Sequence, residues 1–209
     1  MKIKTLILGD LHTNVYVVYD EEYKDAIVID PAAEEDKIIQ FIDENNLNLK
    51  GILITHGHYD HFRAANKVRD TYGVPVFASI EESEAMENPN INLSVRFTGT
   101  PIIAKADEII NDGDIIEFSE LVFQCIKVPG HSSGSICFYS EENKVLFCGD
   151  TLFASAIGRT DFYDGPQDTL ITEIKSKLMC LPEETKVYPG HGLRTTIDYE
   201  SRANAYLLY

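Results

Sequence analysis

The segment THGHYDH, residues 55–61, restricts the fold of this chain more than any other feature of its sequence. It places three of the chain's six histidines and one aspartate within six consecutive positions. The apolar run 52–54 just before it predicts a buried strand, and the apolar spacing after it predicts a helix from His61 to Gly73. The polar cluster is therefore expected in a strand-to-helix loop, where functional sites are often built.

The residue types in this loop are those that bind divalent metal ions. Neutral imidazole and carboxylate are ligands for zinc and related ions. His56, His58 and Asp60 alternate along the segment, and alternating residues of an extended chain project to the same side. His61 can turn toward a neighbouring position. The segment thus offers two ligands to each of two sites about 3.5–4 Å apart, the spacing of a two-metal centre. A solvated histidine-rich tract is the alternative, which the context disfavours.

Three further residues of the ligand type follow predicted strands elsewhere. His131 and His191 each occupy a Pro-Gly-His turn directly after a strand, and Asp150 ends the strand 144–149. A lone histidine after a strand is more often a turn residue than a ligand. Three ligand-type residues at three strand ends, together with the first loop, favour one shared site. His12 has no motif role and is expected in a turn or at a pocket edge.

The segments THGHYDH, PGHSSGS, CGDTLF, GRTDF and PGHG, in this order, resemble the metallo-β-lactamase superfamily, specifically its glyoxalase II-like hydrolase branch. The resemblance extends over nearly the whole chain. It implies an α/β fold, a four-layer αββα sandwich with the metals at one edge, where the two sheets meet. The implied ligands are His56, His58 and His131 for the first metal, Asp60, His61 and His191 for the second, and Asp150 as the bridge.

The resemblance also implies a reaction. Two divalent ions, with zinc expected and iron or manganese as alternatives, would hold a bridging hydroxide of lowered pKa that attacks the substrate. Asp60 would be catalytic by orienting this hydroxide. The sequence shows no obvious general acid, which suits a thiolate leaving group because thiols ionise at about pH 8.5. We therefore expect an acyl thioester substrate, such as a hydroxyacyl-glutathione.

Two segments are candidates for substrate contact. In 158–165, Arg159 and Tyr163 occupy the region where glyoxalase II enzymes present a basic residue and a tyrosine to glutathione. The alternative is a buried Arg159–Asp161 pair that supports the site. The segment 87–101 is expected to be a surface loop, with a lid over the site as its alternative. Full-length glyoxalase II enzymes carry an additional helical domain, whereas residues 192–209 suffice here for one short helix. The identity of the acyl-thiol substrate is therefore left open.

Other functions of the same superfamily are alternatives. A sulfur dioxygenase that acts on persulfides would need a single iron bound by His56, His131 and Asp150, but retention of the other ligands favours two metals. A β-lactamase is disfavoured because Cys148 lies two residues before Asp150, inside the strand, and not at a ligand position. A non-enzymatic module with a degenerate metal site is disfavoured by the complete ligand set.

The rest of the chain predicts two sets of strands, each with a helix, as an αββα fold requires. The first set comprises strands at 2–9, 14–20, 25–30 and 47–55 and helices at 34–46 and 61–73. The second set comprises strands at 114–119, 121–128, 135–140, 144–149 and 185–190 and a helix at 168–181.

Length and composition restrict the remaining possibilities. With 209 residues and 44% hydrophobic content, we expect a single domain over residues 1–209. The net charge of −16 argues against nucleic acid as a partner. No apolar run is long enough for a transmembrane helix or a signal peptide. Four cysteines without a Cys-x-x-Cys pair suggest reduced thiols. We expect a cytoplasmic enzyme that acts on a small-molecule substrate. The sequence does not determine its oligomeric state.

Overall fold

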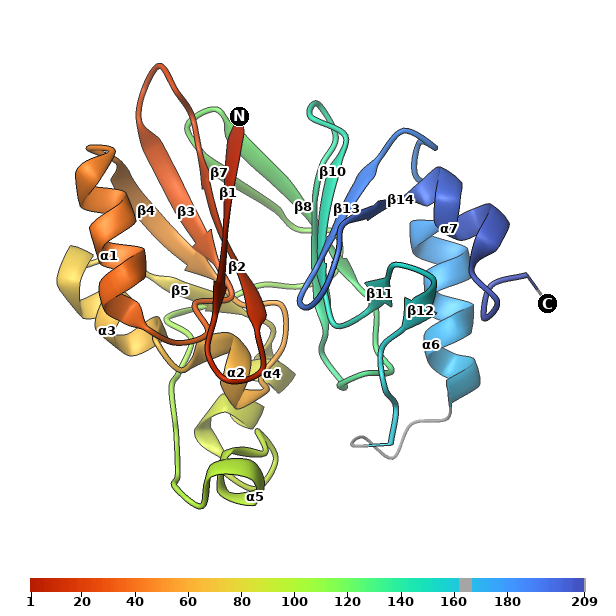
Figure 1. Cartoon of the computed structure of the whole chain (residues 1–209), viewed down its shortest axis with the longest axis horizontal. Helices are drawn as coiled ribbons and strands as arrows, with labels where there is room; N and C mark the ends of the chain where they lie inside the picture. The colour runs from red at the N-terminus through yellow and green to blue at the C-terminus, as the bar shows by residue number, and fades with distance from the viewer. Residues whose placement is uncertain (162–166, 209) are drawn as a thin grey trace.

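Two six-stranded sheets lie face to face in the computed structural model, which describes residues 1–161 and 167–208 (Figure 1). The first sheet has the order β1-β2-β3-β4-β5-β6 and the second the order β14-β13-β10-β9-β8-β7. The strands of the first sheet are β1 Lys2–Leu8, β2 Thr13–Tyr19, β3 Asp25–Ile29, β4 Asn48–Leu53, β5 Val76–Ala78 and β6 Glu108–Ile109. Those of the second are β7 Ile115–Phe118, β8 Leu121–Lys127, β9 Ile136–Ser140, β10 Val145–Gly149, β13 Lys186–Pro189 and β14 Thr195–Thr196.

Helices cover the outer faces of both sheets. Figure 1 shows α1 and α3 outside the first sheet and α6 and α7 outside the second. A small hairpin, β11 and β12, stands beside the second sheet. The helices are α1 Glu35–Glu44, α2 Tyr59–Phe62, α3 Ala65–Tyr72, α4 Ile80–Glu87, α5 Ser94–Thr98, α6 Gln167–Glu173 with a π-helical continuation Ile174–Leu178, and α7 Ile197–Ala203; the hairpin strands are β11 Leu152–Phe153 and β12 Ala156–Ile157.

The inner strands β3, β9 and β10 are buried on both sides because both faces of each sheet are covered there. In β3, Ala26 and Val28 pack beneath the outer helices, whereas Ile27 and Ile29 face the second sheet. This alternation follows from the two-residue period of a strand. A second layer of apolar contacts fills the space between the sheets, and a third lies between the second sheet and its helices. The predicted four-layer αββα sandwich is therefore confirmed.

The helix predicted over 61–73 is wrong in its continuity. The chain forms α2 and α3 instead, separated after Phe62. The N–H of Ala64 donates to the carbonyl of Pro31 at 2.9 Å, so it is not available to the helix that precedes it. The predicted end is correct, since Gly73 adopts the left-handed conformation (φ 65°) that commonly follows a helix.

The two sheets meet where the predicted ligand loops lie. The N–H of Ile136 donates to the carbonyl of Thr55 at 2.9 Å, and that of Asn14 to the carbonyl of Gly190 at 2.7 Å. These bonds join the end of β4 to β9, and β2 to the turn after β13. No helix among the described residues combines the length and apolar character needed to cross a bilayer.

Candidate metal site

The ligand-type side chains predicted from the sequence lie together at this junction. They come from the ends of four strands, two of them neighbours in the second sheet. His56 and His58 follow β4, Asp60 and His61 lie in α2, His131 follows β8, Asp150 follows β10, and His191 follows β13.

The first cluster consists of His56, His58 and His131, whose candidate ligand atoms all lie within 4.8 Å of one another. Nε2 of His131 is 3.0 Å from Nδ1 of His58. The Nδ1–H of His131 donates to the carbonyl of Arg159 at 2.7 Å, because a carbonyl oxygen can only accept. Its Nε2 therefore carries a lone pair. Nε2 of His56 is buried and has no hydrogen-bond partner among the described residues, which fits a nitrogen that binds a cation.

The second cluster consists of Asp60, His61 and His191, within the same limit of 4.8 Å. The Nε2 atoms of His61 and His191 are 3.3 Å apart, and Oδ2 of Asp60 lies 3.3 Å from Nε2 of His191. Each ring is oriented by its other nitrogen: Nδ1 of His61 lies 2.9 Å from a carboxylate oxygen of Asp30, and Nδ1 of His191 donates to the carbonyl of Leu11 at 3.1 Å. Such outward bonds leave both Nε2 atoms available as ligands.

Asp150 faces both clusters. Its Oδ2 lies 3.7 Å from Nε2 of His131 and 3.6 Å from Nε2 of His191. Its Oδ1 is buried without a hydrogen-bond partner among the described residues, 3.6 Å from Nε2 of His61. An unpaired buried carboxylate oxygen is costly unless a cation neutralises it. The histidine and aspartate clusters therefore fit a metal site with one shared carboxylate.

The charges of the two clusters differ. Burial, and then the neighbouring His131, lower the pKa of His58 to about 3, and burial followed by the adjacent histidines lowers that of His56. Both rings are neutral at neutral pH, which is the form that binds metals. Burial also opposes the protonation of His61, but Asp60 and Asp150 outweigh it and raise the pKa of His61 to about 10. A cation bound in the second cluster would displace this proton.

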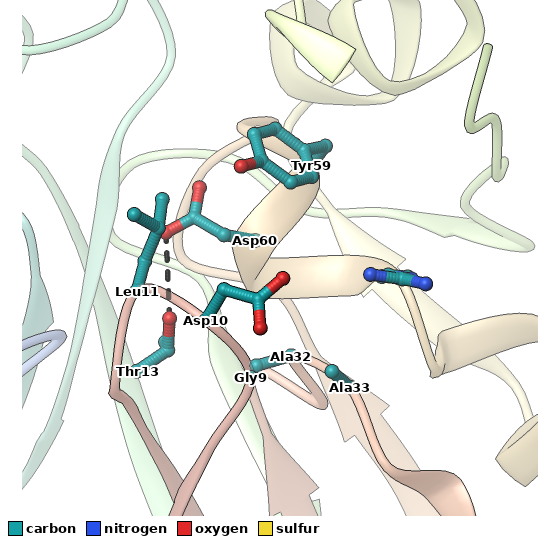
Figure 2. A pocket seen from close by; sticks show the side chains of 9 residues that line it. Gly9, Asp10, Leu11, Thr13, Ala32, Ala33, Tyr59 and Asp60 are labelled. Atoms are coloured by element: carbon teal, nitrogen blue, oxygen red, sulfur yellow. Dashed lines mark hydrogen bonds between the residues drawn. The ribbon is translucent and has the colours of Figure 1, made fainter. Parts of the chain in front are cut away.

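A hydrogen bond from outside the two clusters also fixes the position of Asp60. The hydroxyl of Thr13 donates to its Oδ2 at 3.3 Å, as Figure 2 shows in a small pocket beside the site. Burial raises the pKa of Asp60, but His61 and His191 outweigh this and hold it well below its usual range. Asp60 is therefore a carboxylate at neutral pH.

Two carboxylates that support the site were not found from the sequence. Asp30, at the end of β3, accepts hydrogen bonds from the N–H and hydroxyl of Thr55 at 2.8 and 2.7 Å, in addition to facing His61. The hydroxyl of Thr55 in turn lies 3.1 Å from Nδ1 of His56. Asp30 follows a strand, as Asp150 does, and this shared position was the available signal.

The second of these carboxylates belongs to Glu82 in α4. It is almost fully buried and accepts hydrogen bonds from the N–H of Gly57 and of Gly134, each at 2.6 Å, and from the hydroxyl of Ser132 at 2.7 Å. Burial raises the pKa of this carboxyl. No local pattern in the sequence distinguishes Glu82 from the other glutamates of its helix.

A cavity of ≈ 370 Å³ opens above the two clusters. Its wall includes Arg159, whose contact with substrate stays a prediction, and the alternative of a buried Arg159–Asp161 pair is wrong. The two side chains form a bidentate ion pair at 2.7 and 2.9 Å while 65% and 63% exposed. Tyr163 lies outside the described residues. The segment 87–101 is more than a surface loop, since it contains α5 and supplies Leu93 and Phe97 to the cavity wall.

The remaining histidine and the cysteines are not among the described residues that line the cavity. His12 is exposed in a turn with a positive φ of 57°, as expected. All four cysteines are free, and the three in strands are buried. Sγ of Cys148 lies 3.1 Å from the carbonyl of Leu152, among the apolar residues under the outer helices of the second sheet.

Comparison with known proteins identifies the family. Residues 8–191 match the model of the metallo-β-lactamase superfamily, and the chain belongs to this superfamily. The superfamily resemblance expected from the motifs is confirmed.

Among its relatives, the chain is 38% identical to hydroxyacylglutathione hydrolase GloC of Haemophilus influenzae, over 99% of this chain and 98% of the other. The crystal structure of the BLEG-1 B3 metallo-β-lactamase superposes with a TM-score of 0.95 at 37% identity, with both chains fully covered. The structure of TTHA1623 in a di-iron-bound form superposes with a TM-score of 0.85 at 32% identity, over 98% of this chain and 100% of the other. These similarities support a metal-dependent hydrolase of this superfamily.

Proposed function

We propose that this protein is a dinuclear metal hydrolase that cleaves acyl thioesters, such as a hydroxyacyl-glutathione. The observation that carries the proposal is the single carboxylate of Asp150 facing both ligand clusters. The similarity to hydroxyacylglutathione hydrolase GloC supports the thioester as the bond that is cleaved.

The proposed ligand sets follow the two clusters. His56, His58 and His131 bind the first ion, Asp60, His61 and His191 bind the second, and Asp150 is shared. Zinc is the proposed ion, with manganese or iron as alternatives; the similarity to the di-iron form of TTHA1623 supports iron as one that this donor set accepts. Bound divalent ions supply a Lewis acid for the carbonyl and lower the pKa of water.

The side chains of the protein supply orientation. Asp60, ionised at neutral pH and held at Oδ2 by Thr13, accepts a hydrogen bond from the attacking water and so fixes its direction. His131 cannot rotate away because its Nδ1–H is bound to the carbonyl of Arg159. The catalytic role of Asp60 is therefore to orient the attacking water.

The cleft favours a leaving group that departs without protonation. Among its described lining residues other than the proposed ligands, Tyr59 and Arg159 alone carry ionisable protons. Burial, and then Asp60, raise the pKa of Tyr59, and the hydrogen bonds to Asp161 raise that of Arg159. Neither group readily gives up its proton. A thiolate leaves without one, since thiols ionise at about pH 8.5, whereas an alkoxide or an amide nitrogen does not.

The test is a thioester absorbance assay with S-lactoylglutathione, run beside an oxygen electrode on metal-loaded protein of measured metal content. We expect two metal ions per chain and thioester cleavage without oxygen uptake. Oxygen uptake with glutathione persulfide, one iron per chain and no thioester cleavage would replace the hydrolase by the dioxygenase.

β-Lactam hydrolysis is a second candidate because of the similarity to the BLEG-1 metallo-β-lactamase. The same preparation should therefore be assayed with a penicillin. Faster turnover of the penicillin than of every thioester would favour this second candidate over the first.

A further inference from the structure

The cavity above the ligand clusters has an apolar rim. Its members come from three segments that are far apart in the sequence. The apolar rim consists of Leu11, Leu93, Phe97, Phe153 and Ile157.

Each segment places its apolar side chains at the cavity for a local reason. Leu11 lies in the turn between β1 and β2, next to the carbonyl that binds His191. Leu93 directly precedes α5 and Phe97 lies within it, and the Phe97 ring stacks over Tyr59 at 6.5 Å between centroids. The hairpin β11–β12 supplies Phe153 and Ile157. The rim therefore surrounds the polar floor of the cavity on several sides.

Two of the five members of the rim are strongly exposed. Leu11 and Phe97 are 49% and 53% exposed, whereas Leu93 and Ile157 are buried in the cavity wall. Large apolar side chains gathered at the mouth of a cavity with a few polar groups at its base are typical of small-molecule sites. Covering them with an apolar group would remove this surface from water and so stabilise a complex.

The charges near the cavity disfavour a strongly anionic occupant. Arg159 is the one lysine or arginine among the described lining residues, and its guanidinium is already in a bidentate pair with Asp161. Five of the described lining residues are proposed ligands, and two of these, Asp60 and Asp150, are carboxylates. The whole chain carries a net charge of −16. Away from the proposed metal ions, the charge of the chain therefore favours neutral substituents over anionic ones.

We propose that the rim selects thioesters with an apolar substituent of several carbons beside the scissile bond, in preference to glutathione esters of small hydroxy acids. This inference rests on the proposed thioester hydrolysis and specifies its substrate class. The apolar substituent belongs to either the acyl part or the thiol part, and both place the same chemistry against the rim.

Two series of neutral thioesters test the proposal with metal-loaded protein. In the first, the acyl chain of an N-acetylcysteamine thioester is lengthened from acetyl to octanoyl. In the second, the acyl group stays acetyl and an alkanethiol is lengthened from ethyl to hexyl. We expect kcat/KM to rise roughly two- to fourfold per methylene in one of the series, the increment that burial of a methylene supplies. The series that rises identifies the part of the substrate on the rim.

Variants of the rim test whether it causes the dependence of kcat/KM on chain length. Phe97→Ala and Phe153→Ala should flatten the dependence on chain length, mainly through KM, with metal content unchanged. Ile91→Ala is the matched control, since Ile91 is a 57% exposed apolar residue of the same segment as Phe97 but does not line the cavity. It should keep the slope of the unaltered protein.

A binding measurement separates the inference from the proposed function. Octanoate should bind the metal-loaded protein more tightly than acetate, with a more negative heat-capacity change, because both share one carboxylate and differ in apolar surface alone. If octanoate binds more tightly than acetate but no thioester is cleaved, the inference about the rim is supported and the proposed function is contradicted. If thioesters are cleaved at rates independent of chain length, or S-lactoylglutathione is the best substrate, the inference fails and the proposed function stands.

Discussion

The carboxylate of Glu82 accepts a hydrogen bond from the N–H of Gly57, the residue between His56 and His58, at a distance of 2.6 Å. Its other oxygen accepts from the N–H of Gly134, in the loop that follows His131. One buried carboxylate thus joins the two loops that carry the whole first cluster. The contact is tight, since a Cβ at Gly57 would lie 2.8 Å from the carbonyl oxygen of Glu82.

Replacing Glu82→Gln should therefore weaken metal binding. The amide NH₂ of glutamine would face a backbone N–H in place of an acceptor, so one of the two loops would lose its bond. We expect a loss of roughly 10- to 100-fold in affinity for one metal equivalent, as for other residues that orient ligands. Competition with a chromophoric chelator measures this affinity. Glu84→Gln is the control, because Glu84 is an exposed glutamate of the same helix; equal affinities in the two variants would contradict the role of Glu82.

His58→Ala should lower metal content and thioester hydrolysis together, because one of three proposed nitrogen ligands of the first ion is removed. Elemental analysis of the purified variant gives the stoichiometry. The control is His12→Asn, at an exposed histidine whose positive φ asparagine tolerates. Retention of two metal ions by the His58 variant would remove His58 from the ligand set.

Asp150→Asn should reduce activity by orders of magnitude without unfolding the protein. The substitution keeps the shape of the side chain but removes the charge that two cations would share. Far-UV circular dichroism should match that of the unaltered protein. A spectrum of an unfolded chain would instead assign Asp150 a mainly structural role.

Removal of the metals should lower the melting temperature, since the ligands come from both sheets and bind ions in the folded state alone. At a free metal concentration of 100 times Kd, the expected stabilisation is about 2.7 kcal/mol. Scanning calorimetry with and without a chelator measures it, and re-addition of zinc should restore the original transition. An identical melting temperature in both states would mean that the ions contribute nothing to folding.

Glu200→Gln should disturb the apolar rim from the far side. The buried carboxylate of Glu200 in α7 accepts hydrogen bonds from the N–H of Ser155, in the β11–β12 turn, at 3.0 and 3.1 Å and from the hydroxyl of Thr195 at 2.6 Å. We expect a destabilisation of about 1–3 kcal/mol, typical for a buried acceptor that is lost, and a higher KM. Glu183→Gln, in an exposed pair with Arg202, is the control and should change neither quantity.

The strands and the ligand motifs were predictable because their signals are local. Continuous apolar runs show that both faces of a strand are buried, and the spacing within 55–61 places several ligand types in one loop. The positions of Glu82 and Asp30 were not predictable in this way. Glu82 bonds to residues 25 and 52 positions away, and Asp30 faces a histidine 31 positions away.

The elements that differ from the prediction also depend on contacts between residues far apart in the sequence. The break between α2 and α3 depends on a hydrogen bond from Ala64 to Pro31, which no helical spacing reveals. The short helix α5 lies in the segment 87–101, which was expected to be a surface loop. Phe97 is the instructive case, because its role in the cavity depends on its contact with Tyr59, 38 positions earlier.

The division of the ligands between the two sheets bears on the order of events during synthesis. His61 and His191 face each other at 3.3 Å but are 130 residues apart in the sequence. A growing chain presents the loop 55–61 long before His131, Asp150 and His191 exist to complete either cluster. The partial set binds a cation more weakly than the finished one, so ions captured early exchange freely with the surroundings. Stable metal binding by the proposed ligands therefore depends on the docking of the second sheet.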